Sequence, residues 1–101
     1  MGKVVWTKTA LDQLERIIKY ISEERGNSYA KTVGTRIIER TEQLENFPEL
    51  GPKEPLLQHK KSEYRYLVSW SYKIIYRLSN DRITISRIFH TAQNPEKLKG
   101  I

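Results

Sequence analysis

The chain contains no cysteine among its 101 residues and only two histidines, His59 and His90. A disulfide framework and a thiolate metal site are therefore excluded, and the sequence predicts neither a bound metal ion nor another cofactor. No apolar run approaches the roughly 20 residues that a transmembrane helix needs. Lys8 and Asp12 interrupt the early apolar residues, so no signal peptide is expected and the cytoplasm is the predicted location.

Acidic residues are also in short supply: 12 Asp and Glu stand against 18 Lys and Arg, giving a net charge of +6. Residues 1–47 hold 8 basic and 7 acidic residues, whereas residues 48–101 hold 10 and 5. An excess of positive charge in one part of a chain is typical of proteins that bind nucleic acid or an acidic protein. The length and the 38% hydrophobic content predict one small globular domain, residues 1–101.

The first half of the chain predicts a short strand and two helices. Residues 3–7 carry a strand signal, and Thr9-Ala10-Leu11-Asp12 matches a capping box that predicts a helix start. Gly26 predicts the end of this helix, Asn27 or Ser28 the cap of the next, and Pro48 its end. Apolar residues recur at helical spacing in both segments, at Ala10, Leu14, Ile17, Ile18 and Ile21, and then at Ala30, Val33, Ile37, Leu44 and Phe47. An antiparallel helical hairpin is expected.

The second half predicts strands. Residues 48–62 contain three prolines and Gly51, which predicts a long loop without regular structure. Residues 64–77 predict a β-hairpin with a corner at Ser69-Trp70-Ser71. Residues 82–90 predict a last strand whose alternation slips between Ile85 and Ile88, which indicates either a bulge or a strand covered on both faces. A bulge often re-aims a side chain near a site, and the candidate here is His90. The order β-α-α-β-β-β predicts an α+β fold, with one antiparallel sheet and the N-terminal helical hairpin packed on one face.

Side chains alternate between the two faces of a strand, so the hairpin should have two different faces. We expect the helices to cover a face that includes Tyr72, Ile74 and Tyr76, with Tyr64, Tyr66 and Val68 on one face of the first arm. The other, open face would then carry four candidate functional residues: Arg65, Lys73, Arg77 and His90. Arg65, Lys73 and Arg77 are the cations of this face, and they fit either the solvated side of a one-sided sheet or a surface that binds phosphate groups or an acidic partner.

The ordered set of motifs resembles the RelE/ParE superfamily of bacterial toxin–antitoxin toxins. The resemblance covers nearly the whole chain: Val-Val-Trp before a helix, Phe47-Pro48 with Gly51, Tyr64-Arg65, Tyr72-Lys-Ile-Ile-Tyr-Arg77, and a last strand ending Ile88-Phe89-His90. It implies a growth-inhibiting toxin of a type II toxin–antitoxin system. It also implies a cognate antitoxin as partner, in a toxin–antitoxin hetero-oligomer.

Within this superfamily, the RelE and YoeB branches cleave mRNA on the ribosome. YoeB-like toxins place a Glu before Pro-Leu, an Arg in the second hairpin strand and His-Tyr at the end of the last strand. The resemblance assigns Glu54 and His90 as a base and an acid, with Arg65, Lys73 and Arg77 as stabilisers of the phosphate. Lys73 replaces the Arg and Thr91 the Tyr.

The ParE branch instead inhibits DNA gyrase and lacks the catalytic set. The long helical hairpin, the aromatic strands and the incomplete nuclease set make the chain resemble this branch slightly more. A third alternative is an inactive relative that acts only in antitoxin binding and operon autoregulation.

Overall fold

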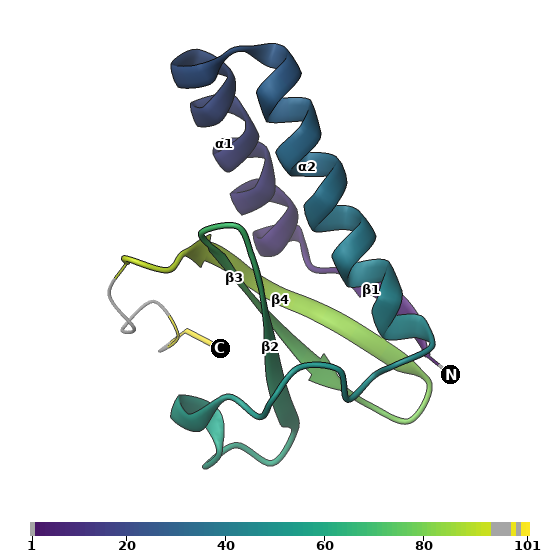
Figure 1. The fold of residues 1–101 in the computed structure, drawn as a ribbon. Helices are drawn as coiled ribbons and strands as arrows, with labels where there is room; N and C mark the ends of the chain where they lie inside the picture. Colours follow the sequence, from purple (N-terminus) through teal and green to yellow (C-terminus); the bar gives the residue numbers. More distant parts are fainter. Residues whose placement is uncertain (1, 94–97, 99) are drawn as a thin grey trace.

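The computed structural model describes residues 2–93, 98 and 100–101. The elements follow the order β1 (Lys3–Trp6), α1 (Lys8–Arg25), α2 (Asn27–Glu42), β2 (Glu63–Ser69), β3 (Tyr72–Leu78) and β4 (Arg82–His90), with short 3-10 helices at Gln43–Glu45 and Pro55–Leu57. Figure 1 shows the helical hairpin standing on one side of the sheet, with the turn between α1 and α2 extending beyond it. The predicted α+β class and element order are confirmed.

The two helices are capped differently from the prediction. The Oγ1 atom of Thr7 accepts a hydrogen bond from the N–H of Ala10 at 3.0 Å, so Thr7 caps α1 and the predicted cap, Thr9, lies inside the helix. Thr7 holds this place because β1 ends just before it and its backbone is still extended. Gly26 ends α1 as predicted, with φ of 95°, a conformation that favours glycine. Gly26 also precedes α2 directly, so the predicted caps Asn27 and Ser28 lie within that helix.

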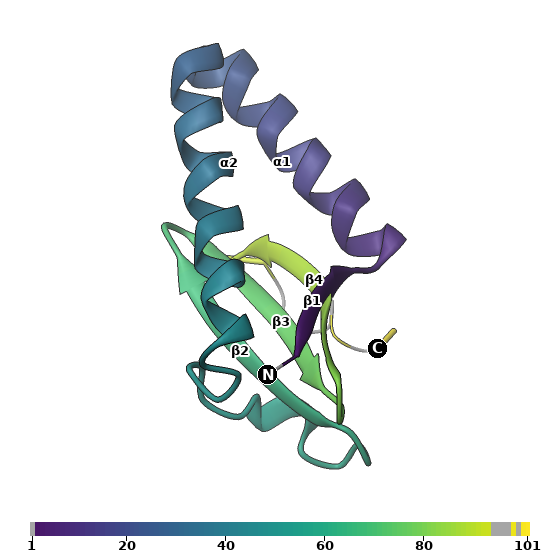
Figure 2. The ribbon, with the colours of Figure 1, turned by 90° about the vertical axis from the view of Figure 1, so that its right-hand side faces the viewer.

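The sheet is mixed, whereas a wholly antiparallel sheet was predicted. Its strand order is β1-β4-β3-β2, and β1 pairs with β4 in parallel, with Lys3 opposite Arg82 and Trp6 opposite Ile85. The other two pairings are antiparallel. The predicted bulge in β4 is confirmed: Ile75 pairs with Arg87 and Tyr76 with Ile85. Figure 2 shows β1 beside β4 at the foot of α1.

The hairpin turn contains two residues, Trp70 and Ser71, because Ser69 pairs with Tyr72. A three-residue corner was predicted, and a shift of one residue in register moves every side chain of a strand to the other face. Arg65 therefore lies opposite Tyr76, and Tyr66 lies opposite Ile75. The predicted face assignment of the first arm is wrong for this reason.

Hydrophobic residues are buried on both faces of the sheet. The larger core lies between the sheet and the helices and includes the predicted residues Ile74 and Tyr76. A second cluster covers the opposite face, so that face is not open as predicted; it contains Leu57, Ile75, Phe89 and Leu98, with Tyr64, Tyr66 and Ile101 packed against them. Phe47 is 64% exposed and not in the core, because α2 ends at Glu42 and a 3-10 turn follows.

The segment Pro52–Glu54 runs along the outer edge of β2. The N–H of Glu54 donates to the carbonyl of Tyr64 at 2.9 Å, and the N–H of Tyr66 donates to the carbonyl of Pro52 at 3.1 Å. This segment was predicted to lie in an unstructured loop. It instead covers the exposed edge of the sheet and fixes the position of Glu54.

Tyr76 fastens the start of the same loop. Its hydroxyl donates to the carbonyl of Pro48 at 2.9 Å and accepts from the N–H of Gly51 at 3.0 Å. Burial raises the pKa of the Tyr76 phenol above its ordinary value of about 10. The folded chain therefore holds this proton to a higher pH than the unfolded chain does.

We expect the free energy of unfolding to fall as the pH rises above about 10, since the unfolded chain then binds fewer protons. Tyr76→Phe should lower the free energy of unfolding by about 1–3 kcal/mol at pH 7, because it leaves buried backbone groups unpaired. The variant should also lose less stability than the parent above about pH 10, since it has no phenol at this position to ionise. Urea unfolding at pH 7, 9 and 11 measures both effects. Tyr20→Phe, which removes a hydroxyl from an exposed side chain, is the control and should change stability by less than about 0.5 kcal/mol.

Candidate functional site

Arg65 supports the loop and does not lie on the face that carries Lys73 and Arg77. Its Nη1 donates to the carbonyl of Gly51 at 2.7 Å, and its Nε pairs with the carboxylate of Glu63. The side chain is 13% exposed. Two of the three guanidinium nitrogens of Arg65, Nη1 and Nε, therefore make contacts within the protein.

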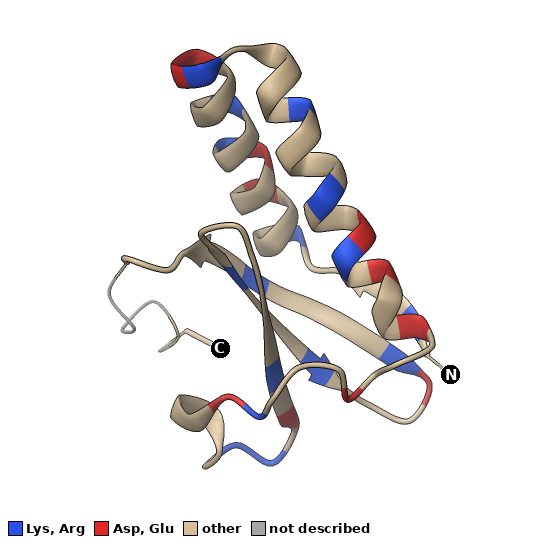
Figure 3. Ribbon diagram, viewed as in Figure 1, with Lys and Arg blue, Asp and Glu red and all other residues tan. Residues whose placement is uncertain are grey.

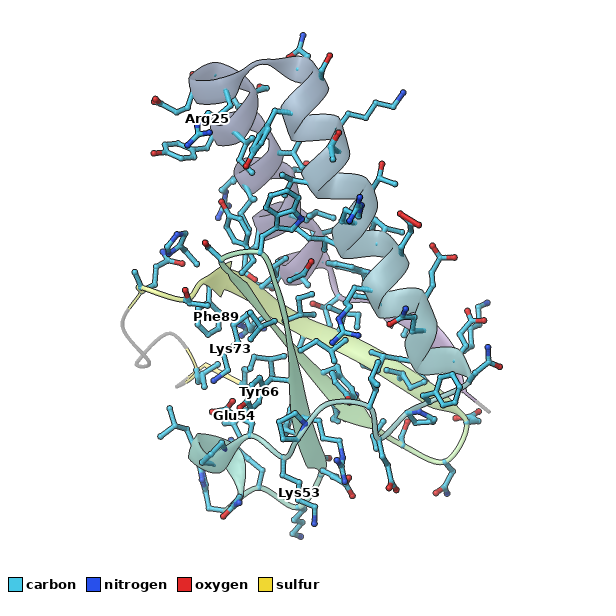
Figure 4. All side chains as sticks on the ribbon, in the orientation of Figure 1. Arg25, Lys53, Glu54, Tyr66, Lys73 and Phe89 are labelled. Carbon is cyan, nitrogen blue, oxygen red and sulfur yellow. The ribbon has the colours of Figure 1, made fainter. Side chains whose placement is uncertain are left out.

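Lys73 and Glu54 form a buried ion pair on the face of the sheet away from the helices. The Nζ atom of Lys73 lies 2.7 Å from the Oε2 atom of Glu54, and Glu54 is only 1% exposed. The same ammonium lies 4.3 Å from the centre of the Tyr66 ring, and Figure 4 shows the three side chains close together. The Oε1 atom of Glu54 accepts from the N–H of Leu56. The charge of Lys73 is therefore largely neutralised inside the protein.

Arg77 shares this face with Lys73 but stands further along β3. It pairs with Tyr64 of β2 and Thr84 of β4 and is half-buried. Figure 3 shows Lys and Arg spread over the helices, the strands and the loop before β2, with acidic residues among them. Of the four residues predicted for the open face, the structure places only Lys73 and Arg77 on the face away from the helices.

His90 lies on the opposite face from Glu54. It ends β4 opposite Tyr72, which belongs to the helix-side face, and the two rings meet edge to face at 5.5 Å. The Nδ1 atom accepts a hydrogen bond from the N–H of Ala92 at 3.0 Å. With Nδ1 accepting, the ring N–H of His90 lies on Nε2, which is the donor. The structure does not bring His90 and Glu54 together.

Sequence reasoning missed a groove between the end of the helical hairpin and the β2–β3 turn. Its volume is about 370 Å³, and four of its ten lining residues are Tyr or Trp. Tyr20 and Tyr29 come from α1 and α2, Trp70 from the turn and Tyr72 from β3. The available signal was Tyr20 and Tyr29 on either side of the helix break at Gly26, together with a Trp in a turn.

Burial raises the pKa of the Tyr72 phenol, and the nearby phenols of Tyr20 and Tyr29 raise it further. Tyr72 is thus a neutral hydrogen-bonding group that lines this groove.

Among the described residues, no group of three or more His, Asp or Glu side chains could hold a metal ion. In the same part of the chain, no helix is long and apolar enough to span a membrane.

One comparison with known proteins identifies the family, and a second supports the fold. The family model described as "ParE toxin of type II toxin-antitoxin system, parDE" matches residues 4–95. A solved structure titled "Chromosomal ParDE TA system from P. aeruginosa" has the same fold, with a TM-score of 0.73 and 22% sequence identity. The match covers 89% of this chain and 96% of that one. A search of curated proteins gave no match.

The fold is thus that of a ParDE-type toxin–antitoxin protein, a mixed sheet with a helical hairpin on one face. The chain belongs to the ParE toxin family of type II toxin–antitoxin systems. Membership implies an antitoxin partner, as the resemblance predicted. Neither of these two matches is to a YoeB-like toxin.

Proposed function

We propose that this ParE-family toxin stops growth by inhibiting DNA gyrase. The observation that carries the proposal is the position of the two candidate catalytic residues. Glu54 pairs with Lys73 on one face of the sheet, and His90 contacts Tyr72 on the other. A general base and a general acid must both reach the same phosphodiester, which residues on opposite faces do not do.

The state of the cations supports the same proposal. A nuclease needs free positive charge around the phosphorane that forms during RNA cleavage. Lys73 lies against a buried carboxylate, and Arg65 is held by Gly51 and Glu63. A toxin that binds a protein–DNA enzyme does not need these groups as catalysts, so they are free to serve as structural supports.

An antitoxin is the second partner. We propose a toxin–antitoxin hetero-oligomer in which the antitoxin neutralises the toxin. The net charge of +6 favours an acidic antitoxin segment.

The test compares the two target processes. The chain is expressed without its antitoxin, and mRNA 5′ ends on ribosomes are mapped alongside a supercoiling and DNA-cleavage assay with purified gyrase. We expect gyrase-linked DNA breaks and intact mRNA. Glu54→Gln, which keeps an amide oxygen for the N–H of Leu56, should inhibit gyrase within about twofold of the parent, because Glu54 has no catalytic role.

Codon-phased mRNA cuts that disappear in Glu54→Gln and in His90→Ala would contradict the proposal and assign the chain as a ribosome-dependent endonuclease. Growth, gyrase and mRNA that all stay unaffected, with antitoxin binding retained, would assign it as an inactive relative. Circular dichroism of each variant confirms that it is folded.

A further inference from the structure

The aromatic groove is formed by segments far apart in the sequence. Tyr20 near the end of α1, Tyr29 near the start of α2, Trp70 in the β2–β3 turn and Tyr72 in β3 all line it. Tyr20 is 62% exposed and Trp70 is 50% exposed. Large aromatic side chains bury 150–250 Å² each when they can, so several exposed rings around one groove indicate a binding surface.

The rings of this groove meet edge to face in two pairs. Tyr29 and Trp70 meet edge to face, with centroids 5.8 Å apart and an interplanar angle of 68°. Tyr72 and His90 meet at 85°. In an edge-to-face pair, one ring contacts its neighbour through its edge, so this contact does not cover that ring's own faces.

Positive groups flank the rings. The Arg25 guanidinium lies 5.4 Å from the centre of the Tyr29 ring, near the end of the helical hairpin (Figure 4). Trp70 also lines an adjoining groove that contains Arg36 and Arg40. Acidic groups are present too, Glu24 in the first groove and Glu39 in the second. The two grooves together therefore contain three Arg and two Glu side chains, a net charge of +1. His90 adds a hydrogen-bond donor, because Nδ1 is occupied and the proton is on Nε2.

Trp70 occupies an unfavourable backbone conformation. Its φ is +57°, and it is the one non-glycine residue in the described part of the chain with a positive φ. Glycine or asparagine is favoured at such turn positions, and bulky residues there are strained. Strained residues cluster at functional sites. A turn that needed only to join two strands would carry a smaller residue here.

We propose that this groove binds an unpaired base of a nucleic-acid strand, which stacks on the aromatic faces while Arg25, Arg36 and Arg40 attract the backbone. Aromatic side chains beside basic ones are the usual way in which proteins hold single strands without reading their sequence. The chain's net charge of +6 favours a polyanion over a cationic peptide as the occupant. The inference does not depend on the proposed function, since DNA and RNA share this chemistry.

Binding is measured with the purified chain of 101 residues. Trp70 fluorescence is followed in a Trp6→Phe background, where Trp70 is the only Trp left. A second method, fluorescence anisotropy of a labelled strand, does not depend on Trp fluorescence and is used with proteins that retain Trp6. The probes are an eight-nucleotide oligo-dT, the matching oligo-U, an abasic strand of the same length and a short duplex. We expect saturable quenching by the first two and at least tenfold weaker binding of the others, which offer no free base to stack.

Three variants test the groove. Tyr29→Ala and Trp70→Gly should each weaken binding about 5- to 150-fold, the range for loss of one stacking partner. Trp70→Gly should melt at a temperature no lower than the parent, because glycine relieves the positive φ. Phe47→Ala is the matched control: Phe47 is also exposed but lies beyond the other end of α2, and its loss should leave binding unchanged.

Equal binding of the abasic strand would overturn the proposal and assign the interaction to charge alone. The proposal would also fail if no oligonucleotide bound while Trp70→Gly, still folded, lost antitoxin binding or gyrase inhibition; the groove would then be a protein-docking surface. Comparison of oligo-dT with oligo-U distinguishes a DNA from an RNA source. A negative result in the oligonucleotide-binding experiment would leave the result of the gyrase supercoiling and cleavage assay unchanged, so the two proposals are tested separately.

Discussion

Gly51→Ala should reduce the free energy of unfolding by about 3–5 kcal/mol. A Cβ at Gly51 would lie 1.9 Å from the carbonyl oxygen of Tyr66 and 2.8 Å from its carbonyl carbon. Both atoms belong to the backbone of β2, so no side chain can rotate away to make room. The segment Gly51–Glu54 would have to move off the edge of the sheet.

That movement breaks further contacts. The N–H of Gly51 bonds to the Tyr76 hydroxyl, and its carbonyl accepts from Arg65. The first of these hydrogen bonds is buried and the second partly buried, so their loss leaves polar groups without partners away from water. A domain of this size has about 5–15 kcal/mol of stability in total, so the variant should be only marginally folded.

Urea unfolding at pH 7 measures this loss, with Gly26→Ala as the matched control. Gly26 has φ of +95° and no atom within 4 Å of the added Cβ, so its substitution tests backbone strain without a clash. We expect that control to reduce the free energy of unfolding by about 1–3 kcal/mol, because its backbone conformation is one that only glycine adopts readily. The packing argument fails if both variants unfold at the same urea concentration.

Lys73→Met should cost about 3–5 kcal/mol, because it leaves the buried Glu54 carboxylate without its cation. No other hydrogen-bond donor among the described residues reaches Oε2 of Glu54. The Lys73 ammonium itself is 2.7 Å away, and its side chain is 23% exposed. The change also removes the contact between the ammonium and the Tyr66 ring.

The double variant Lys73→Met with Glu54→Gln is expected to recover much of this loss, since it no longer contains a buried unpaired charge. Lys53→Met is the control: Lys53 is an exposed lysine next to Glu54, and its change should cost less than about 0.5 kcal/mol. Thermal and urea unfolding of the parent, the single variants Lys73→Met and Glu54→Gln, and the double variant gives the coupling energy between the two side chains. A coupling energy near zero would mean that the pair does not stabilise the fold.

The same double variant bears on function. If Lys73 and Glu54 are structural supports, a folded double variant should keep the toxin's activity. If they act on an RNA phosphate, activity should be lost even though stability is recovered. Measuring both the free energy of unfolding and the toxin activity of the double variant therefore distinguishes a structural role of this ion pair from a catalytic one.

Much of the fold could be predicted because its signals are local. Helical periodicity, Gly26 at the helix break, the two hairpin strands and the slip in β4 each depend on a few neighbouring residues, and each is found in the structure. The family resemblance rested on the order of these same motifs, and the match over residues 4–95 agrees with it. The cap at Thr7 was missed because a capping residue is defined by where the preceding strand ends.

The candidate site was less predictable, because burial and pairing depend on distant segments. The sequence identified Glu54, Lys73 and His90 as notable residues, but it could not indicate that the first two neutralise each other or that His90 lies on the opposite face. Arg65 was assigned to the wrong face by a single residue of register. The aromatic groove could not be seen at all, since its rings come from four elements.

The sequence by itself determined the element types, the α+β class, the excess of positive charge and the family, because each follows from composition or from patterns a few residues long. Only the tertiary structure decided that β1 runs parallel to β4, that a second cluster covers the far face of the sheet, and which charges are paired. Strand register and burial are set by contacts between residues tens of positions apart. Such contacts leave no local pattern in the chain.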